Sequence, residues 1–323
     1  MSSVRWFGNP YSRTKVAALE FRDAYAFIRI TKMPCTCLAS SRYVRPAGTI
    51  EELMNVAEVY CKNALSRSKI SGKDYALNPY TGCEHGCVYC YAEFMRKYTN
   101  HKEEWGEFVD VKINIVDRLR QQIKRTKPGT IMIGTVTDAY QPLEEKYRLT
   151  RRCLEILADF DFPITILTKS DLVIRDVDIL KGLRNKNVGF TITCIDPKIE
   201  ALFEPKASKL ENRFKALENL GENDIPTFVF FGPILPFFSD SEASIQSLLE
   251  RLKKMGIEKI CFDRMNYLNV KWGKFKTLLK RNFPEALSYY QRVAEDGELY
   301  SARLRALLDH NLSDCCSNYD IVF

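Results

Sequence analysis

Long apolar segments are missing from this sequence. No stretch of it offers the roughly 20 apolar residues that a membrane-spanning helix needs. The first 33 residues carry charged side chains throughout, such as Arg13, Glu20 and Asp23, so we expect no apolar core of a secretory signal there. We therefore expect a cytoplasmic protein without a membrane partner.

A disulfide framework is also missing. The 323 residues include 11 cysteines, an odd number, and these do not follow the regular spacing of small secreted domains. The composition, with 46% hydrophobic and 28% charged residues, is that of an ordinary globular protein. Reduced thiols together with a metal cluster explain this cysteine content better than disulfides do.

A strong charge of one sign is absent as well. The net charge of +7 is a mild excess, and the basic residues are spread over the chain. This charge suits a polyanionic partner such as DNA or RNA, and it suits an ordinary solvated surface equally well.

The cysteines that carry a signal lie in residues 78–91, which read NPYTGCEHGCVYCY. Cys83, Cys87 and Cys90 have the spacing C-x₃-C-x₂-C, and no fourth cysteine lies nearby in the sequence. Thiolates bind iron–sulfur clusters and zinc, usually in sets of four. A four-iron cluster held by three cysteines keeps one iron open for a substrate or cosubstrate, as catalytic metal sites do. We interpret the motif as an open [4Fe–4S] site.

Two other interpretations remain open at this point. Zinc could use the same three thiolates with His85 or a distant cysteine as fourth ligand, although zinc sites usually come as paired C-x₂-C or Cys/His sets. The three thiols could also be unrelated buried side chains. We expect His85 to orient the loop through hydrogen bonds, which is the commoner role of a histidine between cysteine ligands.

Periodicity predicts the regular elements. Thr49 and Glu52 form a capping-box pattern before apolar residues at helical spacing, which predicts a helix at 50–66. From Tyr75 onward, strand-like runs alternate with amphipathic runs in six β/α units. The predicted strands are residues 75–78, 130–136, 163–168, 188–194, 227–232 and 259–262. The predicted helices are residues 115–123 with Asn114 as N-cap, 149–158, 177–183, 210–220 followed by Gly221 as the helix-ending glycine, 244–254, 272–280, 284–294 and 300–308.

Six alternating units predict an α/β fold with a parallel sheet, whose ligands bind at the carboxyl ends of the strands. The loops expected at that rim are residues 83–90, which we call the cysteine loop, and residues 135–145, 168–175, 194–206 and 232–240. We expect three parts in the chain: an N-terminal extension with one helix at 1–70, a catalytic domain at 71–268 and a C-terminal helical segment at 269–323.

Polar residues cluster at the predicted strand ends. Gly134, Thr135, Thr137 and Asp138 stand at the end of the second strand, where they could accept hydrogen bonds from a charged amino group or form an ordinary turn. Lys169 ends the third strand and should reach the rim, where it could pair with a carboxylate or stay solvated. Thr191 and Thr193 share one face of the fourth strand, which β-propensity alone would also explain.

Aromatic and proline residues add candidates. Tyr89 and Tyr91 flank Cys90, and by default they are packing residues that become redox-active only if a radical must be relayed. Residues 232–236, Gly-Pro-Ile-Leu-Pro, could lie against an adenine face or simply end a strand. Possible stacking surfaces for a flipped base are Tyr140, Phe237 and Phe238.

Several motifs together resemble a known family. NPYTGCEHGCVYCYA, GTVTDAYQPLE, TRRCLEIL, ILTKS and GPILPFFSD, between about residues 75 and 267, resemble the spore photoproduct lyase-like (DNA repair photolyase-like) family of the radical S-adenosylmethionine (SAM) superfamily. The resemblance implies a partial (β/α)6 TIM-like barrel. It also implies that SAM chelates the open iron of the [4Fe–4S] cluster, that the methionyl amine lies near residues 134–138 and that Lys169 contacts SAM. Tyr89 and Tyr91 match tyrosines that take part in radical transfer.

One position departs from the family pattern. The lyase has a hydrogen-donating cysteine in a Cys-Thr-Ser-Asp run, and Thr135-Val136-Thr137-Asp138 stands at the matching place here. A hydroxyl does not easily replace a thiol, because its O–H bond is much stronger. Cys194 is the nearest substitute donor, and its other interpretation is a small buried apolar residue.

We therefore predict a radical SAM enzyme. It would take an electron from a donor such as a ferredoxin or flavodoxin and act on an unknown substrate, for which a nucleic-acid base is one candidate. Modification of a peptide or small molecule, and a metal-binding module without turnover, are the alternatives. Cys35, Cys37, Cys315 and Cys316 could hold a second metal site.

Overall fold

The computed structural model describes residues 41–42, 54–266, 268–312 and 318–321. These residues all belong to one of the two units into which the chain divides, Cys35–Phe323. The four cysteines suggested for a second metal site lie outside the described residues, as do residues 50–53 of the predicted first helix.

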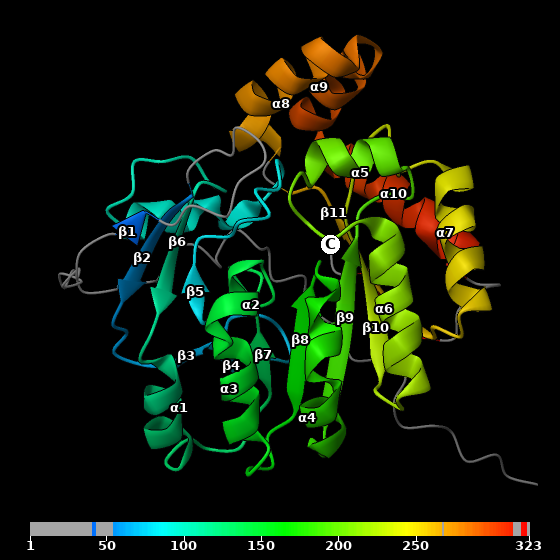
Figure 1. Ribbon diagram of the computed structural model, residues 1–323. Coiled ribbons are helices and arrows are strands. Elements are labelled where there is room, and N and C mark those ends of the chain that lie inside the picture. Colours follow the sequence, from blue (N-terminus) through cyan, green and yellow to red (C-terminus); the bar gives the residue numbers. More distant parts are fainter. Residues whose placement is uncertain (1–40, 43–53, 267, 313–317, 322–323) are drawn as a thin grey trace, which may run out of the picture. The chain divides into compact units, whose positions relative to one another are not determined.

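The main sheet of the described part has eight strands in the order β12-β11-β10-β9-β8-β7-β4-β3 (Figure 1). All neighbours pair in parallel except β3 and β4. Its strands are β3 (Leu65–Arg67), β4 (Tyr75–Leu77), β7 (Ile131–Ile133), β8 (Ile164–Thr168), β9 (Lys186–Ile192), β10 (Thr227–Ile234), β11 (Lys259–Arg264) and β12 (Asn318–Ile321). The six predicted strands are confirmed as β4 and β7 to β11, and the fold is the expected partial barrel of six β/α units.

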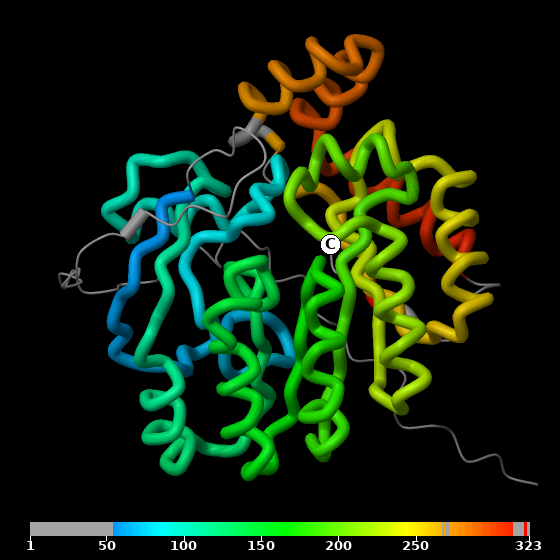
Figure 2. The backbone as a smooth tube through the Cα atoms, in the orientation of Figure 1, coloured from blue at the N-terminus to red at the C-terminus, as the bar shows by residue number. Residues whose placement is uncertain are grey.

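Helices connect the parallel strands. Those between strands are α1 (Ile115–Ile123), α2 (Leu143–Tyr147), α3 (Leu149–Leu157), α4 (Val177–Gly182), α5 (Pro197–Phe203), α6 (Leu210–Glu222) and α7 (Glu242–Lys254), with the 3₁₀ helices η2 (Tyr91–Tyr98) and η3 (Asp171–Asp176). After β11 follow α8 (Leu268–Asn282), η4 (Pro284–Ala286), α9 (Leu287–Glu295) and α10 (Gly297–Leu312). Because consecutive strands are neighbours, the tube in Figure 2 passes from green at β8 to yellow-green at β10 across the sheet.

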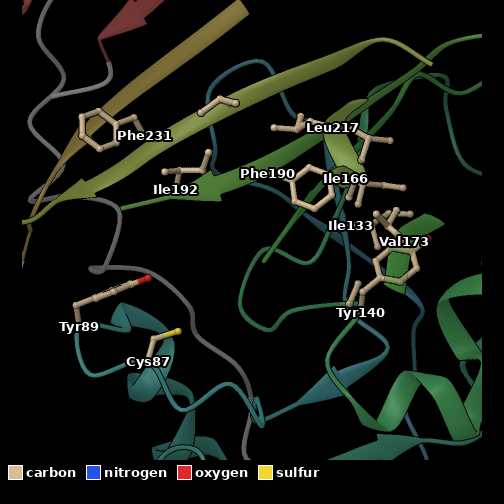
Figure 3. Close-up of a cluster of buried hydrophobic side chains, with 14 of the residues drawn as sticks. Cys87, Tyr89, Ile133, Tyr140, Ile166, Val173, Phe190, Ile192, Leu217 and Phe231 are labelled. Atoms are coloured by element: carbon tan, nitrogen blue, oxygen red, sulfur yellow. The ribbon is translucent and has the colours of Figure 1, made fainter. Parts of the chain in front are cut away.

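The core lies between the strands and the outer helices. Alternate strand residues are large, apolar and almost fully buried, among them Ile166, Phe190 and Phe231. They belong to one cluster with Leu217 of α6 and Val173 of η3 (Figure 3). Burying a side chain of this size contributes about 1.5–3 kcal/mol, so this continuous layer fixes the strand order and thereby the position of the loops at the rim.

The inner face of the sheet is more polar and shows that the sheet curves. Lys73, in the turn before β4, donates from Nζ to Thr165 Oγ1 on β8 at 2.8 Å. Burial and then the charge of Lys259 on β11 lower the pKa of Lys73. Strands two and five places from β4 in the sheet therefore line one interior space with it, as a partial barrel requires.

The helix predicted at 50–66 is wrong. The chain there forms β2 (Asn55–Val59) and β3, separated by a short turn. β2 pairs in parallel with β6 (Phe108–Lys112), in a second sheet of order β1-β2-β6-β5 with β1 (Ser41–Arg42) and β5 (Tyr80–Thr81). Pairing with residues about 50 positions away supplies backbone hydrogen bonds that a local periodicity cannot reveal, and tertiary pairing overrides the helical pattern.

Smaller differences concern element ends. The sequence predicts only helices beyond residue 267, whereas β12 returns to the main sheet beside β11. Gly221 does not end its helix, because α6 continues to Glu222 with Asn223 as C-cap. Asn114 stands at the start of α1, but its side chain bonds the backbone N and O of Cys61 at 2.8 and 3.0 Å instead of capping. β10 runs on to Ile234, so residues 232–234 do not break the strand.

None of the helices in the described ranges is long and apolar enough to cross a membrane. A buried charge network instead fastens the outer helices to the sheet. Glu144 is fully buried and accepts hydrogen bonds from Arg175 Nη2 at 2.8 Å, from Thr150 N at 3.0 Å and from the Tyr80 hydroxyl. Arg175 also pairs with the buried Asp176.

Replacing Glu144 by alanine should destabilise the protein severely, since it breaks the buried ion pair with Arg175 and leaves Thr150 N and the Tyr80 hydroxyl without their acceptor. We expect a loss of about 3–5 kcal/mol in the free energy of unfolding, measured by urea denaturation. Glu211→Ala is the matched control, because it breaks the exposed Glu211–Arg251 pair and should cost less than about 1 kcal/mol. Equal effects of the two changes would contradict the assigned role of Glu144.

Candidate iron–sulfur and SAM site

The cysteine loop begins two residues after β5, at the end of the sheet where the parallel strands finish. Cys83 and Cys87 are each 7% exposed, and Cys90 is half-buried. Figure 3 shows Cys87 and Tyr89 together on this loop. The C-x₃-C-x₂-C spacing thus places three thiols on one mostly buried turn.

Glycines let the loop lie against a second segment of backbone. Gly106 has φ +104°, and a Cβ there would lie 2.7 Å from the Cα of Gly86. A Cβ on Gly82, φ +92°, would lie 2.3 Å from the carbonyl oxygen of Phe108. Only glycine fits either position, so residues 106–108 form a platform on which the cysteine loop rests.

Phe108 is in turn covered by His101. The two rings stack with their centroids 4.1 Å apart and an interplanar angle of 18°. His101 Nε2 lies 2.8 Å from Asp110 Oδ1, and Nδ1 lies 3.3 Å from Glu103 Oε2. The hydrogen bond to Asp110 is the main reason that the pKa of His101 is raised.

The segment after β7 braces the loop from the other side. Asn78 accepts from Thr135 N at 2.9 Å and donates to Thr135 Oγ1 at 2.9 Å. Thr137 Oγ1 donates to the carbonyl of Gly82. Thr135 and Thr137 therefore do not cap the following turn; they tie the end of β7 to the residues that lead into the cysteine loop.

Asp138 links this segment to the end of β8. It accepts from Thr168 Oγ1 and Lys169 N, both at 2.7 Å, and lies 3.4 Å from His85 Nδ1. Burial lowers the pKa of His85. The predicted role of His85 in orienting the loop through hydrogen bonds stays a prediction.

A buried carboxylate, Glu204, connects the cysteine loop to β9 and α6. It accepts from the Tyr89 hydroxyl and from Thr193 Oγ1 at 3.1 Å. Its second oxygen lies 2.5 Å from Arg213 Nη2, a charge pair without a well-aligned hydrogen bond. Burial opposes ionisation, but Arg213 and then Lys169 outweigh it and hold the pKa of Glu204 below its ordinary value.

The two predicted tyrosines lie in different surroundings. Tyr89 is 8% exposed, and the Lys169 ammonium lies 5.6 Å from its ring centroid. Tyr91 is 46% exposed, and its hydroxyl donates to the carbonyl of Thr135. A role of either tyrosine in radical transfer stays a prediction.

The other predicted site residues, on or just after β9, are all buried. Thr191 and Thr193 are buried on β9, and Cys194 is 2% exposed, with Sγ 3.5 Å from the carbonyl of Asp196. Burial raises the pKa of Cys194 to about 12, as for a small apolar core residue, and its donor role stays a prediction.

Of the three residues proposed to stack on a base, the structure excludes Tyr140 and leaves Phe238 only partly accessible. Tyr140 is fully buried in the core and cannot stack on a base. Phe238 is half-buried and packs against Phe203, Phe283 and Tyr290. Phe237, 42% exposed, stays available.

The donor set suits an iron–sulfur cluster better than zinc. It consists of three thiols, while His85, the alternative ligand considered in the sequence, lies 3.4 Å from Asp138. Burial raises the pKa of Cys87 to about 12 and that of Cys83 as well, so metal binding must displace their protons. Within the described residues no three Cys, His, Asp or Glu side chains already surround one point, so the fit rests on the chemistry and burial of the loop.

Comparison with known proteins decides the family. The profile of the Radical SAM superfamily matches residues 77–249, more than half of the chain. The chain belongs to the radical SAM superfamily. An uncharacterised protein of Methanocaldococcus jannaschii is 36% identical over 234 residues, which cover 72% of this chain and 85% of that protein.

Two further similarities concern activity and fold. A radical SAM Nα-GlyT isomerase of Pseudomonas phage M6 is 22% identical over 55% of this chain and 36% of its own length. The structure of spore photoproduct lyase complexed with dinucleoside spore photoproduct has a TM-score of 0.61 and 15% identity, and covers 83% of this chain and 82% of that one. The predicted resemblance is thus confirmed for the superfamily and the fold. The chain is an enzyme of a superfamily that implies SAM and an iron–sulfur cluster.

The structure also reveals site residues that sequence reasoning missed, namely Glu204, Arg213, Asn78, Gly106 and His101. Asn78 is the first residue of the stretch that carries the cysteine motif, and its position there was the available signal. Glu204 and Arg213 lie nine residues apart on different elements, and no spacing rule joins them.

The contacts of His101 with Asp110 and Glu103, which we call the His101 clamp, make the stability of the fold depend on pH. The folded protein binds the His101 proton more tightly than the unfolded chain does, because the pKa of His101 is raised in the fold. This stabilisation is fully present below pH 6.5, the ordinary value, and is lost as the pH rises through the raised pKa. Asp110 and Glu103 are the charged groups that face the ring. The stability difference between wild type and His101→Gln, from urea denaturation, should therefore shrink above pH 6.5. A difference that is constant or grows with pH would contradict the clamp.

Proposed function

We propose that the enzyme holds a [4Fe–4S] cluster through Cys83, Cys87 and Cys90 and cleaves SAM reductively. The observation that carries this is a set of three thiols, two buried and one half-buried, on one loop at the strand ends of a radical SAM barrel. When bound, such a cluster would supply one electron, from a donor such as a ferredoxin or flavodoxin, to split SAM and give a 5′-deoxyadenosyl radical.

The protein's own residues would orient SAM and exclude water. We assign this role to Gly134, Thr135, Thr137, Asp138, Lys169, Thr191 and Thr193. Support comes from their position, since they stand at or near the ends of three adjacent strands next to the cysteine loop. Gly134, φ +84°, allows the end of β7 to pack closely on the Thr137 and Leu167 carbonyls, because a Cβ there would lie 3.1 and 3.2 Å from their oxygens.

We infer that the substrate is a nucleic-acid base. An aromatic row formed by Tyr91, Phe94 and Tyr98 on η2 directly follows the cysteine loop. Tyr91 and Phe94 stack with centroids 6.4 Å apart, and Lys97 Nζ lies 5.0 Å from the Tyr98 ring. Exposed aromatic faces interleaved with a cation favour stacked bases on a phosphate backbone.

Two further observations support this substrate class. Tyr91 and Tyr98 are 46% and 45% exposed, so both side chains are accessible to solvent on the helix that follows the cysteine loop. The net charge of +7 favours a polyanion, and the similarly folded spore photoproduct lyase was solved with a dinucleoside photoproduct.

SAM cleavage tests the proposed chemistry. Protein reconstituted anaerobically with iron and sulfide should form 5′-deoxyadenosine from SAM and dithionite, detected by mass spectrometry. Cys87→Ala should reduce formation to background, because the loop then offers two thiolates. Cys153→Ala, which removes a buried thiol on α3 away from the loop, should stay active. The proposal fails if wild type forms no 5′-deoxyadenosine or if Cys87→Ala forms as much as wild type.

Oligonucleotide binding tests the substrate class. Single-stranded DNA and RNA should bind with an affinity that falls as salt rises, measured by fluorescence anisotropy. Phe94→Ala and Tyr98→Ala should each weaken binding by about 1–3 kcal/mol, the usual value for one stacked base. Leu299→Ala, which removes an exposed apolar side chain on α10, is the control and should have no effect. An oligonucleotide affinity that does not change with salt or with either aromatic substitution would argue for a peptide or a small molecule as substrate.

A further inference from the structure

Metal binding by three thiols does not explain why a buried carboxylic acid, Glu204, lies beside them. Glu204 is 2% exposed and Arg213 is fully buried, and neither belongs to the cysteine motif. A buried charge costs several kcal/mol to desolvate, even in a pair. Such a pair calls for a role that an apolar contact would not supply.

The contacts of Glu204 join three separate segments. Its one oxygen accepts from Tyr89 of the cysteine loop and from Thr193 at the end of β9. Its other oxygen pairs with Arg213 of α6. Arg213 is itself fixed by the carbonyls of Thr191, at 3.0 Å, and Ser208, at 2.7 Å.

Backbone bonds beside Glu204 reinforce the junction. Val88 N, between the second and third cysteines, donates to Phe203 O at 2.9 Å, and Lys206 N donates to His85 O at 3.3 Å. The segment from Phe203 to Lys206 therefore runs along the cysteine loop. Within this segment the Glu204 side chain contacts both the cysteine loop, at Tyr89, and the end of β9, at Thr193.

We propose that Glu204 is a positioning residue that locks the cysteine loop against β9 through the Tyr89 hydroxyl, so that the three thiols are held in place before any cluster binds. This inference rests on the proposed function for its purpose, but the locking itself is a property of the protein chain. Arg213 keeps Glu204 ionised, and a carboxylate is a stronger acceptor for the phenol than a neutral acid or amide.

Thiol labelling of the full-length, cluster-free protein tests the lock directly. Brief iodoacetamide exposure followed by trypsin gives a peptide of residues 74–96, which contains Cys83, Cys87 and Cys90 as its only cysteines. The peptide of residues 153–169 contains Cys153, fully buried in the core, and reports global unfolding in the same sample. The ratio of the two labelling rates isolates local release of the loop.

Glu204→Gln should raise the labelling rate of peptide 74–96 about tenfold or more, in keeping with loss of a hydrogen bond to a charged group, and leave peptide 153–169 unchanged. Tyr89→Phe should give the same increase, and the double variant should react no faster than either single variant. Glu200→Gln, which removes the other carboxylate of Arg213 without touching Tyr89, is the matched control and should stay within about twofold of wild type.

Three outcomes would overturn the proposal: an unchanged loop rate in Glu204→Gln, a parallel rise in both peptides, or rate increases that multiply in the double variant. Labelling needs neither iron nor SAM, so its result is independent of whether SAM is cleaved. If labelling shows the lock but no 5′-deoxyadenosine forms, only the proposed function fails. If 5′-deoxyadenosine forms but labelling shows no lock, only the proposed role of Glu204 fails.

Discussion

The paired charge of Glu204 and Arg213 lies where three distant parts of the chain meet. The cysteine loop, the end of β9 and the start of α6 are brought together by the curvature of the sheet, and the ion pair fastens them there. Neither charge could be buried without the other, because an unpaired charge in this interior would cost more than the fold gains from it. The geometry of the loop thus depends on the barrel closing correctly around this pair.

The loop is held on its other sides by different means. Glycine positions allow backbone to lie on backbone at the platform of residues 106–108, while Asn78 and Asp138 bind backbone N–H groups of the neighbouring strand ends. Contacts of this kind fix the loop without using the thiols. The three sulfur atoms therefore stay available as ligands, which is what preorganisation of a metal site requires.

Much of the barrel could be predicted from sequence. The runs that became β8, β10 and β11 are short, β-branched or aromatic, and separated by helices with clear apolar faces, so local pattern and tertiary structure agree. The pattern failed where pairing is long-range. Residues 55–59 have apolar residues at helical spacing, yet they join β6 because that strand offers a complete set of backbone partners.

The site divides in the same way. The cysteine motif is local and could be recognised, and the rim position of Asp138 and Lys169 followed from the order of strands and loops. Glu204, Arg213 and His101 could not be predicted, since their roles depend on partners that are distant in sequence and adjacent only after folding. Tyr140 shows the opposite error, because a residue on a predicted rim loop turned inward and became core.

Mössbauer spectroscopy of protein reconstituted with ⁵⁷Fe tests the central claim, that three cysteines hold a cluster with one open iron. The account predicts about four irons per chain and a spectrum in which one iron changes when SAM is added, as expected for a cubane with three thiolate ligands. A stoichiometric zinc content without bound iron, or a four-iron spectrum that does not respond to SAM, would contradict it.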